Sequence, residues 1–184
     1  ILRKMENHVI LCGYGRVGQE ISNQIKTQNI PIIVVEIDED RKKVAEENGL
    51  EVLCADATLD ETLKLAGLEK CKSLVVTLPN DASNLYVVLS AKGIRSSIRV
   101  IARAGTEEAA SKLRLAGASI VVSPYIAAGR AMASMALRPI AIDFLDLLAG
   151  SECEIEEFEL SNDINLFKTA EKRSLSEVGI GKKS

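Results

Sequence analysis

The sequence predicts an α/β fold, namely a doubly wound, Rossmann-like sheet of six parallel strands. Apolar segments rich in β-branched residues alternate six times with amphipathic, helix-like segments. These apolar segments are continuous rather than interrupted by polar residues, as expected for strands that are covered on both faces. The first segment runs into three glycines spaced G-x-G-x-x-G, a turn that joins a strand to a nucleotide-binding helix in this fold.

The expected elements follow one another in a regular strand and helix order. The predicted strands span residues 8–12, 30–36, 51–55, 73–78, 98–103 and 119–124. The predicted helices between them span residues 16–28, 38–48, 60–66, 82–93 and 107–116. Because a helix separates each strand from the next, the strands are expected to pair in parallel through right-handed crossovers, in the order 3-2-1-4-5-6.

Residues with typical capping side chains precede several of these helices, and glycines follow them. The predicted N-caps are Asp38, Asp60 or Thr58, Asp81 and Thr106. A left-handed residue often ends a helix, and the predicted positions of this kind are Gly49, Gly67, Gly93 and Gly117.

The glycine loop is interpreted as a phosphate-binding turn. Gly13 permits the tight turn out of the strand, Gly15 lets backbone approach a pyrophosphate, and Gly18 lets the helix pack against the strand. The helix that begins near Arg16 directs free N–H groups toward the phosphates, and Arg16 itself is expected to reach one. The alternative is a glycine turn that only packs. The candidate contacts from this loop are Gly13, Tyr14, Gly15, Arg16, Val17 and Gly18.

An acidic residue, Glu36, ends the second predicted strand. A carboxylate at this position accepts hydrogen bonds from the ribose hydroxyls of an adenosine. It also repels a 2′-phosphate, which favours NAD(H) or an adenine nucleotide over NADP. Ile37 follows it in the expected pocket, whereas Asp38 is interpreted as a helix cap. The alternative is that Glu36 is a solvated acid in the acid-rich segment "VVEIDED".

The other strand ends are expected to complete the pocket, because ligands of open parallel sheets bind beyond the carboxyl ends of the strands. Asp56 and Ala57 follow the third strand and are expected to flank an adenine. Thr77 and Leu78 end the fourth strand beside the glycine loop. Arg103 ends the fifth strand and is expected to reach a phosphate, the alternative being a surface ion pair.

Composition excludes several other classes of function. Aromatic residues make up 3% of the chain and the net charge is -3, which argues against a nucleic-acid partner. The four cysteines lack the close spacing of a zinc site, so they are interpreted as reduced thiols, with Cys12 and Cys54 as small apolar residues in strands. The single histidine, His8, has no evident catalytic partner. No apolar run reaches the ~18 residues of a membrane span.

The segment 125–137, "YIAAGRAMASMAL", predicts a helix that pairs two copies of the chain. It is apolar nearly all round, apart from Arg130 and Ser134 on one face. Such a helix lies either in a core or under a partner. Because it follows the last strand, at the edge of the sheet, a partner is the expected cover. The alternative is packing against its own sheet alone.

Six segments together carry a resemblance to a known family. They are "HVILCGYGRVG", "VVEID", "CADAT", "LVVTLPND", "RVIARA" and, most specifically, "LRLAGASIVVSPYIAAGRAMA". Over residues 7–138 the chain resembles the regulator of potassium conductance (RCK, or TrkA-N) domain. The resemblance implies a linker from a pore or upstream segment at 1–6, a crossover and dimer helix at 124–138, and a hinge with the beginning of a small C-terminal lobe at 139–184.

The resemblance implies a cytoplasmic regulatory domain at the inner face of the cell membrane. Such domains bind NAD(H) or an adenine nucleotide, form homodimers that assemble into tetrameric or octameric rings, and act on a potassium-conducting pore. Whether the pore belongs to the same chain, or the chain is a soluble TrkA-type gating subunit, stays open. By resemblance the ligand contacts are Gly13, Gly15, Gly18, Glu36, Asp56 and Arg103, with Arg16 at a terminal phosphate.

Two further alternatives concern chemistry. Some members of the family bind calcium near the lobe junction, where this chain has Asp143, Asp146, Glu154, Glu156 and Glu157. No loop spacing organises these acids, so a solvated acidic face is favoured over a calcium site. An NAD-dependent oxidoreductase would need a substrate domain and a catalytic acid or base. Residues 139–184 contain no histidine, and the chain is therefore predicted not to be an enzyme.

Overall fold

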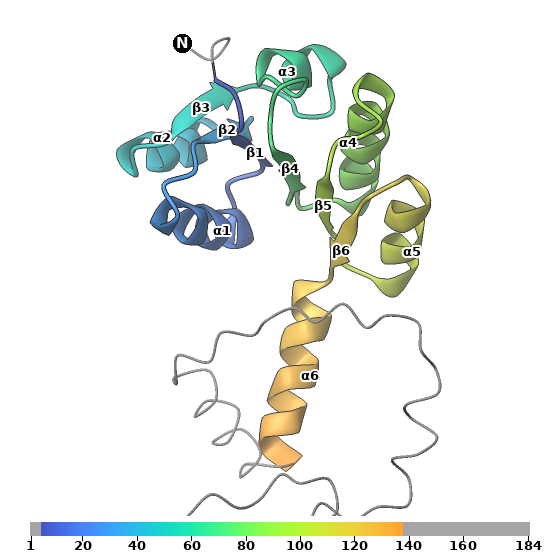
Figure 1. The fold of residues 1–184 in the computed structure, drawn as a ribbon. Helices are drawn as coiled ribbons and strands as arrows, with labels where there is room; N and C mark the ends of the chain where they lie inside the picture. The colour runs from blue at the N-terminus through green and yellow to red at the C-terminus, as the bar shows by residue number, and fades with distance from the viewer. Residues whose placement is uncertain (1–4, 138–184) are drawn as a thin grey trace, which may run out of the picture. The chain divides into compact units, whose positions relative to one another are not determined.

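Residues 5–137 are described by the computed structural model, in which six parallel strands alternate with helices (Figure 1). The strands are β1 (Val9–Cys12), β2 (Ile32–Glu36), β3 (Glu51–Cys54), β4 (Ser73–Val76), β5 (Val100–Arg103) and β6 (Ile120–Val122). The helices are α1 (Arg16–Thr27), α2 (Glu39–Glu47), α3 (Asp60–Leu65), α4 (Asp81–Ile94), α5 (Glu107–Leu115) and α6 (Pro124–Leu137). The strand order β3-β2-β1-β4-β5-β6 confirms the doubly wound sheet predicted from the sequence. The expected hinge and C-terminal lobe, and the candidate calcium ligands, lie outside the described residues.

All six strands are shorter than predicted, because the hydrogen-bonded ladder rather than apolar character sets their ends. All four residues of β1 pair with β2 on one side and with β4 on the other. The predicted strands extend past the observed ones by residues 30–31, 77–78 and 98–99, among which Ile30, Leu78 and Ile98 are apolar. Thr77 and Leu78 therefore lie beyond β4, at the carboxyl edge of the sheet where a site would form.

Several of the predicted helix ends are confirmed. The Asp38 carboxylate accepts hydrogen bonds from two N–H groups of the first turn of α2, and the Thr106 hydroxyl caps α5 by accepting one, from the N–H of Ala109. Gly49, Gly67 and Gly117 have the positive φ that favours glycine after a helix. These ends follow local chain chemistry, which is why the sequence reveals them.

The predicted caps of α3 are wrong. Its N-cap is Leu59, which makes no side-chain capping bond, and Asp60 is already within the helix. The hydroxyl and N–H of Thr58 instead donate to the Asp56 carboxylate. The side chain of Thr58, one of the two expected caps, is thus used in a turn before the helix.

Both predicted ends of α4 are also wrong by one or two residues. Asn80, not Asp81, caps the helix, while the Asp81 carboxylate accepts a 2.8 Å hydrogen bond from the N–H of Gly105. Gly93 lies inside the helix, whose C-cap is Arg95. Asp81 thus connects the start of α4 to the loop after β5. The two residues are far apart in the sequence, so no local pattern predicts this contact.

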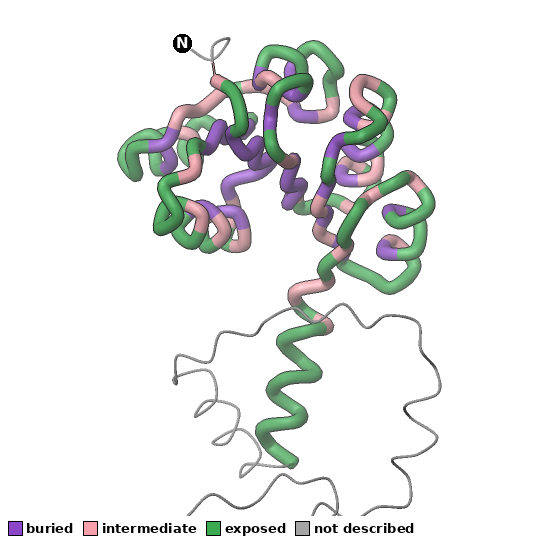
Figure 2. The backbone as a smooth tube through the Cα atoms, viewed as in Figure 1, coloured by how far each residue is buried: buried purple, intermediate pink, exposed green. Residues whose placement is uncertain are grey.

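Apolar side chains on the two faces of the sheet form two cores. On one face, Ile10 and Cys12 of β1 pack in a core that also takes in α3, α4 and α5. On the other face, Val9 and Leu11 pack in a core with α1 and α2. Buried residues therefore concentrate in the central strands (Figure 2). This two-sided burial explains the continuous apolar runs.

Helix α6 differs from the other described helices because none of its residues is buried (Figure 2). Met132 and Leu137 are 69% and 80% exposed. The side chain of Arg130 makes an ion pair with Glu107 of α5 at 3.3 Å. The alternative that this helix packs only against its own sheet does not hold within residues 5–137, and its pairing with a second copy stays a prediction. No helix among residues 5–137 is both long and apolar enough to cross a membrane.

Candidate functional site

The glycine loop connects β1 to α1, and its three glycines differ in the space around them and in their backbone conformation. A Cβ on Gly18 would lie 2.2 Å from the carbonyl oxygen of Gly13, so α1 can approach the loop only without a side chain there. Gly13 has a φ of 93°, in the left-handed region. A Cβ on Gly15 would meet no protein atom within 4 Å. Packing therefore explains Gly13 and Gly18, whereas the space in front of Gly15 is open.

The N-terminus of α1 is left without compensation by side chains. Its N-cap is Gly15, which has no side chain to accept hydrogen bonds, and its first turn contains no acidic residue. The first N–H groups of a helix have no partner within the helix and carry the positive end of its dipole. The start of α1 therefore suits an anion.

Glu36, at the end of β2, is 4% exposed. One carboxylate oxygen accepts a 2.7 Å hydrogen bond from the N–H of Tyr14, and the other accepts a 3.0 Å bond from the N–H of Asp38. The guanidinium of Arg41 lies 3.9 Å from the first oxygen. These donors offset the cost of burying the charge. Each oxygen can accept a further bond, so the orientation of this carboxylate is fixed while it remains able to bind hydroxyl groups.

The segment after β4 is held in place by two buried side chains. The Thr77 hydroxyl lies 3.1 Å from the carbonyl oxygens of both Cys12 and Gly13. Asn84 of α4 is fully buried, and its amide bonds both the N–H and the carbonyl of Leu78 at 3.0 and 3.1 Å. The same amide donates to the carbonyl of Arg103 at 3.0 Å. Asn84 therefore fastens the ends of β4 and β5 to each other.

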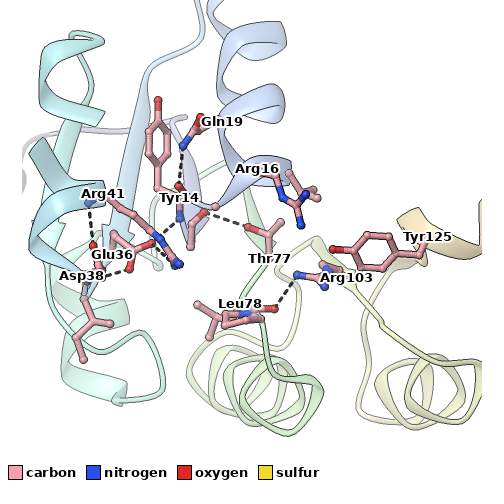
Figure 3. Close-up of a pocket in the computed structure, with 15 residues that line it drawn as sticks. Tyr14, Arg16, Gln19, Glu36, Asp38, Arg41, Thr77, Leu78, Arg103 and Tyr125 are labelled. Atoms are coloured by element: carbon pink, nitrogen blue, oxygen red, sulfur yellow. Dashed lines mark hydrogen bonds and ion pairs between the residues drawn. The ribbon is translucent and has the colours of Figure 1, made fainter. Parts of the chain in front are cut away.

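Two arginines and a tyrosine lie on the side of the site opposite Glu36 (Figure 3). Arg16 begins α1 and is exposed. The guanidinium of Arg103 lies over the ring of Tyr125, 5.4 Å from its centroid, and its Nη1 is 3.5 Å from the carbonyl oxygen of Leu78. Neither arginine forms an ion pair within the described part of the chain. The alternative of a surface ion pair for Arg103 is therefore not supported.

Together these residues surround a cavity of about 520 Å³, within the range of pockets that bind small molecules. It is lined by Gly13, Tyr14, Gly15, Arg16, Val17, Gln19, Glu36, Ile37, Asp38, Arg41, Thr77, Leu78, Pro79, Arg103 and Tyr125. A second hollow of about 320 Å³ shares four of these residues, namely Glu36, Ile37, Leu78 and Pro79. The two cavities thus form adjoining parts of one cleft at the carboxyl edge of the sheet.

The glycine loop, the buried acid and the cleft agree with what a family comparison finds. The model of the TrkA-N domain matches residues 9–124, which span β1 to the start of α6. The chain belongs to the TrkA-N domain family. The resemblance inferred from the sequence is thereby confirmed, and relatives in this family include potassium channel proteins and K⁺ efflux antiporters.

One relative of this TrkA-N domain is potassium channel protein 1 of Methanocaldococcus jannaschii, which is 35% identical over 185 residues. The alignment covers 100% of this chain and 55% of the relative. Probable potassium channel protein 2 of the same organism is 37% identical, with 91% of this chain and 48% of the relative covered. The chain therefore spans about half the length of the channel proteins that it matches.

Solved structures of TrkA-N and RCK domains share the fold. The TrkA-N domain of the Escherichia coli inner membrane protein ybaL is 31% identical with a TM-score of 0.68, covering 72% of this chain and 98% of that one. GsuK bound to ADP is 29% identical with a TM-score of 0.63, covering 73% and 35%. The GsuK channel bound to NAD, at 22% identity, shares the fold with a TM-score of 0.60, covering 65% and 22%. Related domains thus bind adenine nucleotides.

Ten of the thirteen residues predicted for the TrkA-N pocket line the larger cavity. Gly18 lies behind the loop, where its role is close packing. Asp56 and Ala57 line the second hollow instead. The ring of Tyr14 is fully buried, so this residue contributes its backbone to the cavity. Glu36 is not a solvated acid, since it is almost completely buried. That these residues contact a ligand stays a prediction.

Sequence reasoning missed some of the residues that line the cavity. They are Gln19, Arg41, Pro79 and Tyr125, together with Asp38, which was predicted only as a cap. Gln19 and Arg41 lie in the first turns of α1 and α2, so a search of the first turn after each strand finds them. Tyr125 comes from α6, and no local pattern marks it as part of this site.

His8 and the three cysteines among residues 5–137 do not line the larger cavity. Burial raises the pKa of Cys12 to about 12 and that of Cys71 to about 11, so both are protonated and unreactive at neutral pH. Cys54 is a free thiol at the end of β3, as predicted, but it is exposed and does not pack as a small apolar residue. Its thiol lies 3.2 Å from the Glu39 carboxylate, which raises the pKa of the thiol. His8 is fully buried, with its Nε2 2.8 Å from the carbonyl oxygen of Ala66.

Proposed function

We propose that this chain is the ligand-sensing part of a potassium channel or K⁺ antiporter, and that its cleft binds NAD(H) or an adenine nucleotide. The observation that carries the proposal is the loop around Gly15. This glycine is required by no contact within the described protein, yet it faces an uncapped helix N-terminus. A backbone that is kept bare beside free N–H groups is suited to a phosphate group.

The ligand would lie along the cleft with each part facing a chemically matched wall. The phosphates would lie over Gly15, against the N–H groups of α1, with Arg16 and Arg103 as the cations. The ribose hydroxyls would donate to Glu36, whose carboxylate is already oriented by two backbone N–H groups. The adenine would lie in the second hollow, beside Asp56 and the exposed side chain of Ile37.

The charges of the cleft favour a ligand with phosphates at one end and an unmodified ribose at the other. Arg41 is paired with Glu36, so its charge is compensated. Arg16 and Arg103 have no such partner among residues 5–137, and they lie on the other side of the cavity. A 2′-phosphate would meet the buried negative charge of Glu36. We therefore infer selection of NAD(H), ADP or AMP over NADP.

The role of the ligand would be regulatory rather than catalytic. A ligand controls a pore only by binding one arrangement of the paired domains better than another. A tenfold preference corresponds to about 1.4 kcal/mol per site. Shifting a two-state gate from 1:99 to 99:1 takes about 5.5 kcal/mol. Four such sites in an assembly on the cytoplasmic side of a pore would be sufficient, with α6 as the pairing helix.

Calorimetric titration with NADH and ADP tests the proposal. In Gly15→Val the added methyl groups enter the open space in front of the loop, so affinity should fall by about 100-fold, ~2.8 kcal/mol. Gly93→Val is the matched control, because a Cβ there also meets no atom within 4 Å but lies in α4. Unchanged affinity in Gly15→Val contradicts the site. Steady oxidation of NADH by the intact chain contradicts the regulatory role.

A further inference from the structure

Arg103 lies in the cavity with most of its hydrogen-bonding capacity unused. Its Nε is buried without a hydrogen-bond partner, and the one described hydrogen bond of its guanidinium, from Nη1 to the carbonyl of Leu78, is 3.5 Å long. A guanidinium has five N–H donors in a planar fork. Since no carboxylate in residues 5–137 pairs with it, the N–H groups of its two Nη atoms that do not bond Leu78 remain available to an anion that enters the cavity.

The backbone of Arg103 is held firmly, but its side chain is held mainly by one ring. Asn84 fixes the carbonyl of Arg103, as described above. Beyond the long bond to Leu78, the described contact of the guanidinium is with Tyr125, whose ring lies 5.4 Å away. Tyr125 is the second residue of α6, and 58% of it is exposed. The ring therefore lies at the cavity wall rather than in a core.

An aromatic ring that covers the face of a guanidinium leaves its N–H edge free. Stacking on a ring and donating in the plane to a phosphate are compatible, and both favour arginine over lysine. A flexible side chain held in its binding position loses less conformational freedom when the ligand arrives. Tyr125 would thus assist an anionic ligand without touching it.

We propose that Tyr125 is a positioning residue, which holds Arg103 ready for the phosphates of the ligand and so makes affinity depend on the placement of α6. The inference rests on the proposed nucleotide site. Helix α6 has no buried residue among those described, so its N-terminal turn is connected to the cavity chiefly through this stack. Because coupling between two sites is reciprocal, a bound phosphate also favours positions of α6 in which the stack is formed.

Calorimetric titration of the chain with ADP tests the inference through a double-mutant cycle. Tyr125→Leu should weaken binding about fivefold to tenfold, and Tyr125→Phe, which keeps the aromatic face, should restore most of the loss. Arg103→Gln should weaken binding at least as much. In the Arg103→Gln background, Tyr125→Leu should have no further effect, because its ring then has no cation to hold.

Tyr86→Leu provides the matched control, since Tyr86 is similarly exposed, at 61%, but lies on α4 and does not line the cavity. An equal loss on adding Tyr125→Leu to either background means that Tyr125 acts on structure alone and overturns the inference. Unchanged affinity in Tyr125→Leu overturns it as well, while leaving the nucleotide site intact. If the unmodified chain binds neither ADP nor NADH, the proposed function fails and this inference fails with it.

Discussion

Helices α1 and α2 begin side by side at the same edge of the sheet, and both contribute to the cavity. Their N-termini nevertheless differ in how side chains cap them. The N-cap of α2 is Asp38, whose carboxylate accepts two backbone N–H bonds, and the first turn of α2 contains Glu39 and Asp40. The N-cap of α1 is Gly15, which has no capping side chain, and the first turn of α1 contains no acid. Capping and acidic side chains thus compensate the N-terminus of α2, whereas no such side chain compensates the N-terminus of α1.

The difference identifies which helix end is available to a ligand. Capping side chains and first-turn acids stabilise a helix by satisfying its first N–H groups and opposing its dipole. Their absence from α1 leaves donors that only solvent or a bound anion can satisfy. Glu36 connects the two ends, since it accepts one N–H from Tyr14, next to α1, and one from Asp38 at α2. Three substitutions test this comparison.

The largest effect is expected when a capping carboxylate like that of α2 is introduced at the N-cap of α1. Gly15→Asp places a capping carboxylate at a backbone geometry, φ -74° and ψ -170°, that suits an N-cap. ADP affinity should fall by more than about 100-fold, because the new charge repels the phosphates, while the free energy of unfolding rises by ~0.5 kcal/mol. Calorimetry and urea unfolding measure the two quantities.

Gly15→Asn is the control for that substitution, since it supplies a cap of similar size without the charge. It should bind ADP more tightly than Gly15→Asp does. Equal affinities of the two variants would mean that the side chain blocks the site by volume alone, and that the uncompensated end of α1 has no electrostatic role.

An intermediate effect is expected at Glu36, between the two helix ends. Glu36→Gln removes the charge that opposes a 2′-phosphate and leaves the guanidinium of Arg41 unpaired beside it. NADH affinity should fall about tenfold and NADPH affinity should rise, which titration with both dinucleotides measures. One backbone N–H also loses its acceptor, which lowers stability by ~1–3 kcal/mol. A ratio of affinities that stays as in the unmodified chain, or changes equally in Glu39→Gln, would remove Glu36 from the selection of the ribose.

The smallest effect is expected at the cap of α2. Asp38→Ala removes a side chain that accepts two N–H bonds, and the free energy of unfolding should fall by ~1 kcal/mol, a decrease in Tm of ~3–5 °C. ADP affinity should change far less than in Gly15→Asp, because the N–H of Asp38, not its carboxylate, bonds Glu36. Asp40→Ala is the control, and thermal unfolding that is equally lowered in both variants would show that the cap itself contributes little.

Local sequence was informative wherever a structural feature depends on neighbours along the chain. The strand order, the glycine turn and the caps at Asp38 and Thr106 were predicted because each follows from spacing or from a side chain bonding its own helix. The errors at Thr58 and Asp81 have the opposite origin. Both residues were predicted as caps, but Thr58 donates to Asp56 and Asp81 accepts from the N–H of Gly105 instead.

The sequence by itself therefore determined the doubly wound sheet, the loop at Gly15 and the acid at Glu36, since periodicity and motif spacing dictate what lies at the end of each strand. Only the tertiary structure decided that Asn84 fastens Leu78 to Arg103, and that the ring of Tyr125 lies over this arginine. Arg103 and Tyr125 come from different strand and helix units, and their distance is set by how those units pack. A pattern along the chain describes the environment of one segment, whereas a cleft is made where several segments meet.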